Sequence, residues 1–153
     1  MYHILLPIAL LTGGLAAGAL MVSALGGAPM LLSLPVASYV PVHKFLVTRF
    51  DPFMPICLVT AMLCDVGLAI TNPTAVTRII AVLFAAVYLG VMYVSLTKNV
   101  PINKWVEKLD PENLPADWER LDPRKRWRDW NLVRTTLATI GLAGNVLMVA
   151  ILL

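Results

Sequence analysis

The sequence predicts an all-α polytopic membrane protein, a four-transmembrane-helix bundle with short amphipathic segments on its cytoplasmic side. Of its 153 residues, 59% are apolar and only 14% are charged, whereas soluble domains have about 45–50% apolar and roughly 25% charged residues. The apolar residues also gather in four long runs. These features exclude a soluble domain, a disordered chain, a disulfide scaffold and a nucleic-acid module.

The four apolar runs are the predicted spans of a single domain that covers residues 1–153. They cover residues 2–25, 53–71, 79–96 and 132–153. At about 1.5 Å of rise per residue, helices of these lengths reach roughly 27–36 Å, which matches a hydrocarbon core of about 30 Å. The first run lacks a basic leading segment and is longer than the core of a signal peptide, so we expect a retained helix.

Turn residues mark the expected helix boundaries. Asp-Pro pairs occur at residues 51–52, 110–111 and 122–123. Asp accepts hydrogen bonds at a helix start and Pro suits the first helical position, so helices are expected to begin at residues 52, 111 and 123. Asn72-Pro73-Thr74 predicts a short turn, with Thr74 or Thr77 capping the third span.

The basic residues predict the orientation. With four spans, the loops at residues 26–51 and 97–131 share one side, and both termini share the other with the turn at 72–78. Ten of the twelve Lys and Arg lie in the two loops, and only Arg78 lies in the turn. Because cytoplasmic loops are rich in these residues, we expect a plasma (inner) membrane protein with cytoplasmic loops and both termini outside.

The loop at 97–131 mixes its basic residues with acids such as Glu107, Asp117 and Asp129. A nucleic-acid arm would be more uniformly basic, so a solvated, salt-bridged segment is expected and nucleic acid is not an expected partner. The alternative is a surface for anionic lipid or for an acidic substrate. The lipid bilayer itself is the expected partner of the spans.

Small residues line several spans and predict close helix packing. Gly14-x-x-x-Gly18 gives the first span a smooth ridge, and Gly141 and Gly144 do the same for the fourth. Small residues let helix backbones approach in lipid, so these ridges predict a tight bundle and also allow a homo-oligomer.

The sequence argues against several chemistries. Its two histidines, His3 and His43, fall on opposite sides of the predicted membrane, so no metal site is expected. Neither a Ser-His-Asp set nor a glycine-rich phosphate loop is present. Asp65 is the one ionisable residue well inside a span, and such residues mark functional sites or polar pairs. Asp65 therefore either bonds to Asn145 at similar depth or handles a proton or substrate.

The richest polar pattern joins the cytoplasmic ends of spans three and four. Asn99, Pro101, Asn103 and Trp105 follow the third span, and Trp127, Trp130, Asn131 and Arg134 open the fourth on one helical face. Arg134 adjoins an apolar run, so we expect it to turn inward, where Asn99 or Asn103 could accept its hydrogen bonds. In the alternative, the two Asn are helix caps and Arg134 extends to the interface.

The pattern N-x-P-x-N after the third span, followed by W-x-x-W-N-x-x-R, resembles the small four-helix membrane family that includes the anthrone oxygenases. The similarity covers nearly the whole chain. It implies oxidation of anthrone-type polyketides to anthraquinones with dioxygen and without an organic cofactor. By its motif positions, the resemblance implies that the site residues of this chain are Asn99, Asn103, Trp130, Asn131 and Arg134.

If this resemblance extends to activity, a mechanism follows. His43 is not part of the motif, but it lies on the same side of the predicted membrane. We expect it to be the base that deprotonates an electron-rich phenol. Arg134 with Asn99 and Asn103 would stabilise the resulting oxyanion, and Trp127 and Trp130 would stack on a flat lipophilic substrate.

A non-enzymatic function is the main alternative. A small membrane protein that binds or transports a lipophilic molecule, or an accessory subunit of a membrane complex, would need the same bundle. In that case Asp65 should matter most and the cytoplasmic cluster least.

Overall fold

The computed structural model describes residues 1–152, and Leu153, the last residue of the predicted fourth span, lies outside the described residues. Within residues 1–152 the chain is helical with connecting turns. Four of its helical stretches are long and apolar enough to cross a membrane. The predicted class is therefore confirmed, and the chain is an integral membrane protein by the length and composition of its helices.

The first span is continuous over three segments, α1 (Tyr2–Val22), η1 (Ser23–Gly27) and α2 (Ala28–Ser33). It continues beyond the predicted end near residue 25. The π-helical segment η1 carries the helix past Gly26 and Gly27 without a break. The span ends at Ser33, just before Leu34-Pro35, because the residue before proline is disfavoured in the α region. A further helix, α3 (Val36–Phe50), fills most of the expected loop.

The other spans follow the apolar runs closely. They are α4 (Phe53–Thr71), α5 (Ala75–Val94) and α8 (Arg124–Leu152). Helix α5 continues through η2 (Ser95–Asn99) into α6 (Val100–Glu107). The predicted cap is present, because Thr74 Oγ1 accepts from the Thr77 amide at 3.2 Å.

The helix expected at residue 111 is wrong. Asp110 instead accepts from the Glu112 amide through its carboxylate, at 3.0 Å, and from the Asn113 amide through its carbonyl, at 3.2 Å. Pro115 then disfavours an α conformation at Leu114, so the chain stays in turns. The next helix is the short α7 (Trp118–Leu121).

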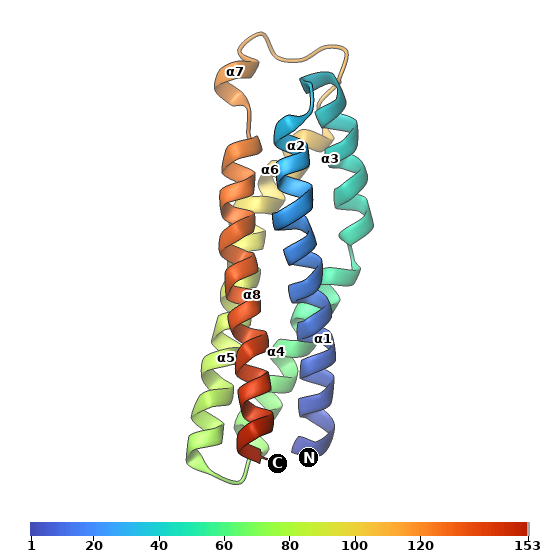
Figure 1. Ribbon diagram of the computed structural model, residues 1–153. Helices are drawn as coiled ribbons and strands as arrows, with labels where there is room; N and C mark the ends of the chain where they lie inside the picture. The colour runs from blue at the N-terminus through green and yellow to red at the C-terminus, as the bar shows by residue number, and fades with distance from the viewer. Residues whose placement is uncertain (153) are drawn as a thin grey trace.

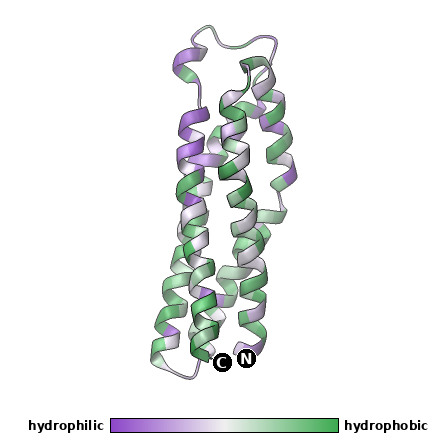
Figure 2. Ribbon diagram, in the orientation of Figure 1, coloured by the Kyte–Doolittle hydropathy of each residue, from purple (hydrophilic) through white to green (hydrophobic). Residues whose placement is uncertain are grey.

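Helices α1, α4, α5 and α8 form the bundle, with α1 and α5 each packed between α4 and α8. Both termini and the α4–α5 turn lie at one end, and α7 and the α2–α3 connection lie at the other (Figure 1). This confirms which segments share a side. Figure 2 shows hydrophilic residues gathered at the α7 end, around the start of α8.

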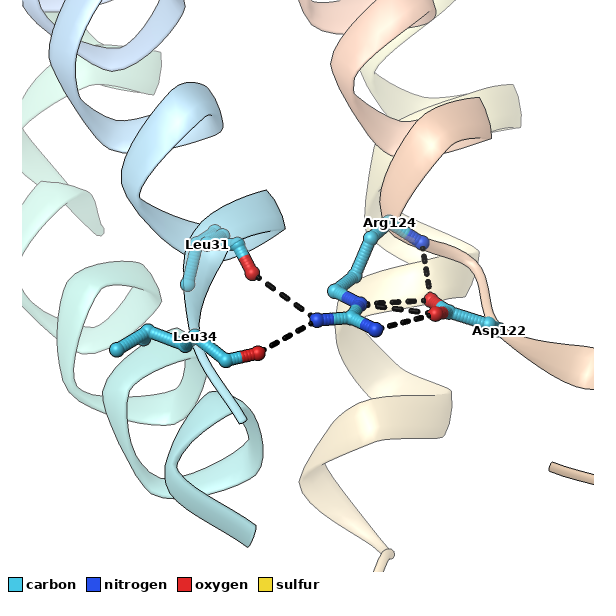
Figure 3. A network of polar contacts seen from close by, with 4 residues as sticks. All are labelled: Leu31, Leu34, Asp122 and Arg124. Carbon is cyan, nitrogen blue, oxygen red and sulfur yellow. Dashed lines mark hydrogen bonds and ion pairs between the residues drawn. The ribbon is translucent and has the colours of Figure 1, made fainter. Parts of the chain in front are cut away.

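Arg124 ties the start of α8 to the α2–α3 corner (Figure 3). Its guanidinium donates to both carboxylate oxygens of Asp122 at 2.6–3.0 Å. It also donates to the carbonyls of Leu31 at 3.4 Å and Leu34 at 2.9 Å. These carbonyls end α2 and lack partners within their own helix, so the contact closes the polar end of the bundle.

Candidate functional site

A cavity of about 520 Å³ lies where the polar end of the bundle meets the spans. Segments η1, α3, α4, η2 and α8 all contribute to its wall. The wall is mainly apolar, with side chains such as Met30, Leu58 and Met92. Its polar side chains are few: Ser23, His43, Asp51, Ser95, Asn103 and Arg134. A mostly apolar cavity of this size with a few convergent polar groups is typical of a small-molecule site.

Two π-helical segments face this cavity from different spans. η1 begins at Ser23 and η2 begins at Ser95, and both serines line the cavity. Each hydroxyl lies within 3.5 Å of the polar pair on α8 formed by Asn131 and Arg134. π-Helical turns are rare and occur often at functional sites, because they reposition side chains within a continuous helix.

His43 on α3 is held by a side chain from α6. Its Nε2 lies 3.0 Å from Oδ1 of Asn103, and the same oxygen accepts from Nε1 of Trp127 at 2.8 Å. The indole N–H can only donate, which fixes the orientation of the Asn103 amide. An amide oxygen can only accept, so His43 Nε2 must carry the proton and Nδ1 carries the lone pair.

The surroundings of His43 keep it neutral. The side chain is 1% exposed, and its ring meets those of Tyr39 and Trp127 edge-on, with centroids 5.3 and 5.2 Å away. Burial lowers the pKa of His43 below its usual 6.5, and the hydrogen bond to Asn103 opposes this only in part. Nδ1 is itself buried and has no hydrogen-bond partner among the described residues. A neutral imidazole with a free lone pair can act as a proton acceptor.

Arg134 turns inward as expected, but to different acceptors. Its Nε and one terminal nitrogen donate to Asn131 Oδ1 at 2.9 and 2.8 Å, and the other terminal nitrogen reaches Ser95 Oγ at 3.4 Å. The expectation that Asn99 or Asn103 would accept from it is wrong, because Asn131, one turn earlier on α8, is closer. Arg134 is 6% exposed and lines the cavity as a buried cation.

Asn99 does not line the cavity but bonds to a residue of its wall. It is fully buried, and its Nδ2 donates to the carbonyl of Trp127 at 3.1 Å. Neither Asn99 nor Asn103 caps a helix with its side chain. The two therefore hold the first turns of α8 against α6, and Asn103 alone of the pair lines the cavity.

A match to a known family shows which family this chain belongs to. The family model described as anthrone oxygenase matches residues 45–144. The chain belongs to the anthrone oxygenase family. No curated protein and no solved structure gives a significant match.

The family match spans most of the site. It includes Asn103, Asn131 and Arg134, whereas His43 lies two residues before it begins. In this anthrone oxygenase family member, residues 1–152 contain no group of three or more His, Cys, Asp or Glu side chains placed to hold a metal ion.

Four predicted site residues are absent from the cavity wall. Asn99 and Asn131 bond to residues of that wall, whereas the other two lie elsewhere. Trp130 is absent from the cavity wall and lines a separate groove, with the ammonium of Lys98 5.0 Å from its ring centroid. Asp65 is fully buried deeper in the bundle, near Tyr88 and Asn145. Asp65 and Asn145 approach each other without reaching hydrogen-bond geometry.

Three polar residues of the cavity, Ser23, Asp51 and Ser95, are not among the site residues predicted from the sequence. Ser23 and Ser95 sit in apolar runs, and only their place in π-helical turns aims them at α8. Asp51, which the Asp-Pro pattern predicts as a helix cap, lines the cavity as well. Its place in the Asp-Pro pair at residues 51–52 was the available signal.

Proposed function

We propose that this protein oxidises a lipophilic aromatic, polyketide-type substrate with dioxygen, without an organic cofactor, inside the cavity. Membership of the anthrone oxygenase family supports this reaction class. The observation that carries it is a largely apolar cavity with neutral His43 and cationic Arg134 in its wall. An apolar wall suits a flat polycyclic ligand, and the two polar groups suit the formation of its anion.

The reaction begins with proton removal. His43 takes a proton from the ring hydroxyl or activated methylene of the substrate through Nδ1, because Nε2 is held by Asn103. Arg134 stabilises the oxygen that becomes negative, as preorganised donors do for developing oxyanions. Asn131 orients the guanidinium through its paired hydrogen bonds.

The oxidation then balances with dioxygen alone. The carbanion gives an electron pair to dioxygen, which forms a carbon–oxygen bond, and the peroxide takes up the proton held by His43. Loss of the remaining hydrogen on that carbon breaks the O–O bond. One oxygen stays as the carbonyl of the quinone, and the other leaves as water.

Trp127 is proposed to shape the cavity wall and to fix His43 through Asn103. The cavity opens among exposed apolar side chains such as Val22, Val59 and Leu96. A substrate dissolved in the bilayer could therefore enter without crossing the aqueous phase. We further propose that the cavity lies toward the cytoplasmic face, as the distribution of basic residues predicts.

Oxygen consumption by the purified protein with an anthrone as substrate tests the proposal. His43→Gln should reduce turnover by about 10²–10⁴-fold, and Arg134→Gln should reduce it at least about tenfold. Arg128→Gln removes an exposed cation from the same helix and is the matched control. Thermal unfolding of each variant shows that it is folded. Full turnover in both site variants would refute the assignment.

A second candidate is a carrier for a lipophilic molecule, and the buried intramembrane Asp65 favours it. Asp65→Asn and Arg134→Gln separate the two functions in one cellular assay. An oxygenase should tolerate the first substitution and lose activity with the second. A carrier should show the reverse order.

A further inference from the structure

A second hollow, of about 500 Å³, lies on the outside of the bundle where η2 and α6 meet α7 and the start of α8. We call it the basic groove. Its charged residues are Lys98 and Arg126, and its wall includes Trp105, Trp130 and Leu121. No acidic residue lines it. It is therefore a hollow with two positive charges and two indole rings.

Within the described part of the chain, the two cations of the basic groove are not paired with acidic side chains. Lys98 lies over the Trp130 ring, with the ammonium 5.0 Å from the centroid. Among residues 1–152, neither Lys98 nor Arg126 has an acidic partner within 4 Å, whereas Arg128 pairs with Asp129 at 2.7 Å. The charges of the basic groove are thus not neutralised by the chain itself.

The basic groove also lies at a definite depth. Lys98 comes two residues after the predicted end of the third span, and Trp130 comes two residues before the predicted start of the fourth. Leu96, just inside, is an exposed apolar side chain suited to lipid. Tryptophan rings and basic residues at the ends of spans lie at the level of lipid headgroups.

We propose that the basic groove binds the headgroup phosphate of an anionic phospholipid. Lys98 and Arg126 would hold the phosphate, and the two tryptophan rings would cover the glycerol region beside it. Basic hollows between helices on the cytoplasmic side are suited to anionic lipid headgroups. The proposal concerns a site separate from the cavity and does not depend on the oxygenase reaction.

Lipid binding to the purified full chain in a neutral detergent tests this assignment, by native mass spectrometry and by thermal stability. Phosphatidylglycerol is compared with phosphatidylcholine and with inorganic phosphate. The double variant Lys98→Gln/Arg126→Gln removes both groove charges. Lys104→Gln/Lys125→Gln removes two exposed charges outside the groove and is the matched control.

We expect phosphatidylglycerol to bind and stabilise the protein more than phosphatidylcholine does. The groove variant should bind it about thirtyfold more weakly, and the control should bind it nearly as well as the unmodified chain. The exchange Lys98→Arg/Arg126→Lys keeps both charges and should retain binding, which distinguishes lost charge from a misfolded groove.

Three results would overturn the proposal. Equal losses in the groove variant and the control would indicate a diffuse charge effect. Equal binding of both lipids would remove the role of the anion. An equal effect of inorganic phosphate would indicate a site for small anions rather than for lipid.

Discussion

Arg134 is a buried cation whose hydrogen-bond partners are all neutral, and replacing it with Met tests why it is there. Arg134 is 6% exposed, and its guanidinium donates to Asn131 and Ser95. Within residues 1–152 no carboxylate lies within 4 Å of the guanidinium. A charged side chain costs about 2.5–3.5 kcal/mol at the centre of a membrane span and less toward its end, where Arg134 lies. A hydrogen bond to a charged group returns about 1.5–3 kcal/mol.

These two contributions nearly cancel for Arg134. Both short bonds share one acceptor oxygen on Asn131, and the contact with Ser95 is long at 3.4 Å. We therefore expect Arg134→Met to change the free energy of unfolding by less than about 1 kcal/mol, which moves Tm by no more than roughly 4 °C in a chain of this size.

The effect on activity should be much larger. Loss of one charge-assisted bond to an anionic reaction centre costs about 1.5–3 kcal/mol, or roughly 10- to 150-fold in kcat/KM. Oxygen uptake gives kcat/KM, and thermal unfolding in detergent gives Tm on the same preparation. Arg134→Lys keeps the charge but loses the paired geometry, so it should fall between the two.

Arg128→Met is the control, because Arg128 and Asp129 form an exposed pair on the same helix. Such pairs contribute about 0–1 kcal/mol, so neither measurement should change appreciably. The reasoning is refuted if Arg134→Met lowers Tm by more than about 4 °C and activity falls only in proportion to the unfolded fraction. Arg134 would then serve the fold.

Three other predictions concern different parts of the molecule. Because burial lowers the pKa of His43 below 6.5, the acidic limb of kcat/KM should be centred below pH 6.5, where the folded His43 takes up a proton. Tm should also fall below pH 6.5, since the unfolded chain binds that proton more readily. An acidic limb centred above 6.5 contradicts this. Arg124→Gln loses the hydrogen bonds from α8 to the carbonyls at the end of α2 and should lower stability by about 2 kcal/mol. Arg120→Gln is the control, because it breaks an ion pair with Asp117 whose side chains are 81% and 48% exposed. It should change the stability by under about 1 kcal/mol. Equal losses of stability in the two variants, measured by thermal unfolding, would show that Arg124 does not join the two helices. An added Cβ at Gly144 would overlap an aromatic ring of α5, but at Gly18 it meets nothing within 4 Å. Gly144→Ala should therefore cost about 1–3 kcal/mol, and Gly18→Ala should be neutral or stabilising. The reverse order would show that Gly18 forms a contact between chains.

Much of the site could be predicted from residue types, but its connections could not. His43, Asn103 and Arg134 were expected on one side of the membrane, and all three line the cavity. Trp127 and Trp130 are three residues apart and were expected to act alike. Helix packing turns Trp127 toward His43, while Trp130 lines the basic groove with Lys98.

The partners of Arg134 show the same limit. The sequence spacing predicts that Asn99 and Asn103 lie at the same end of the bundle as Arg134, which is correct. The guanidinium of Arg134 nevertheless bonds to Asn131 and Ser95. Ser23 and Ser95 lie in apolar runs, and no sequence pattern indicates the π-helical turns that contain them. One extra residue in a helical turn rotates the side chains that follow by about 100°, which changes the neighbour that each one contacts.

The sequence by itself determined the class of this protein, the number of its spans and which segments share an end. Those features depend on the amount and run length of apolar residues, because in lipid every backbone group must bond within a helix of fixed rise. Only the tertiary structure decided the chemistry of the cavity. His43, Asn103 and Trp127 come from three distant segments, and the hydrogen bonds that fix the proton on His43 Nε2 depend on how those helices are rotated against one another.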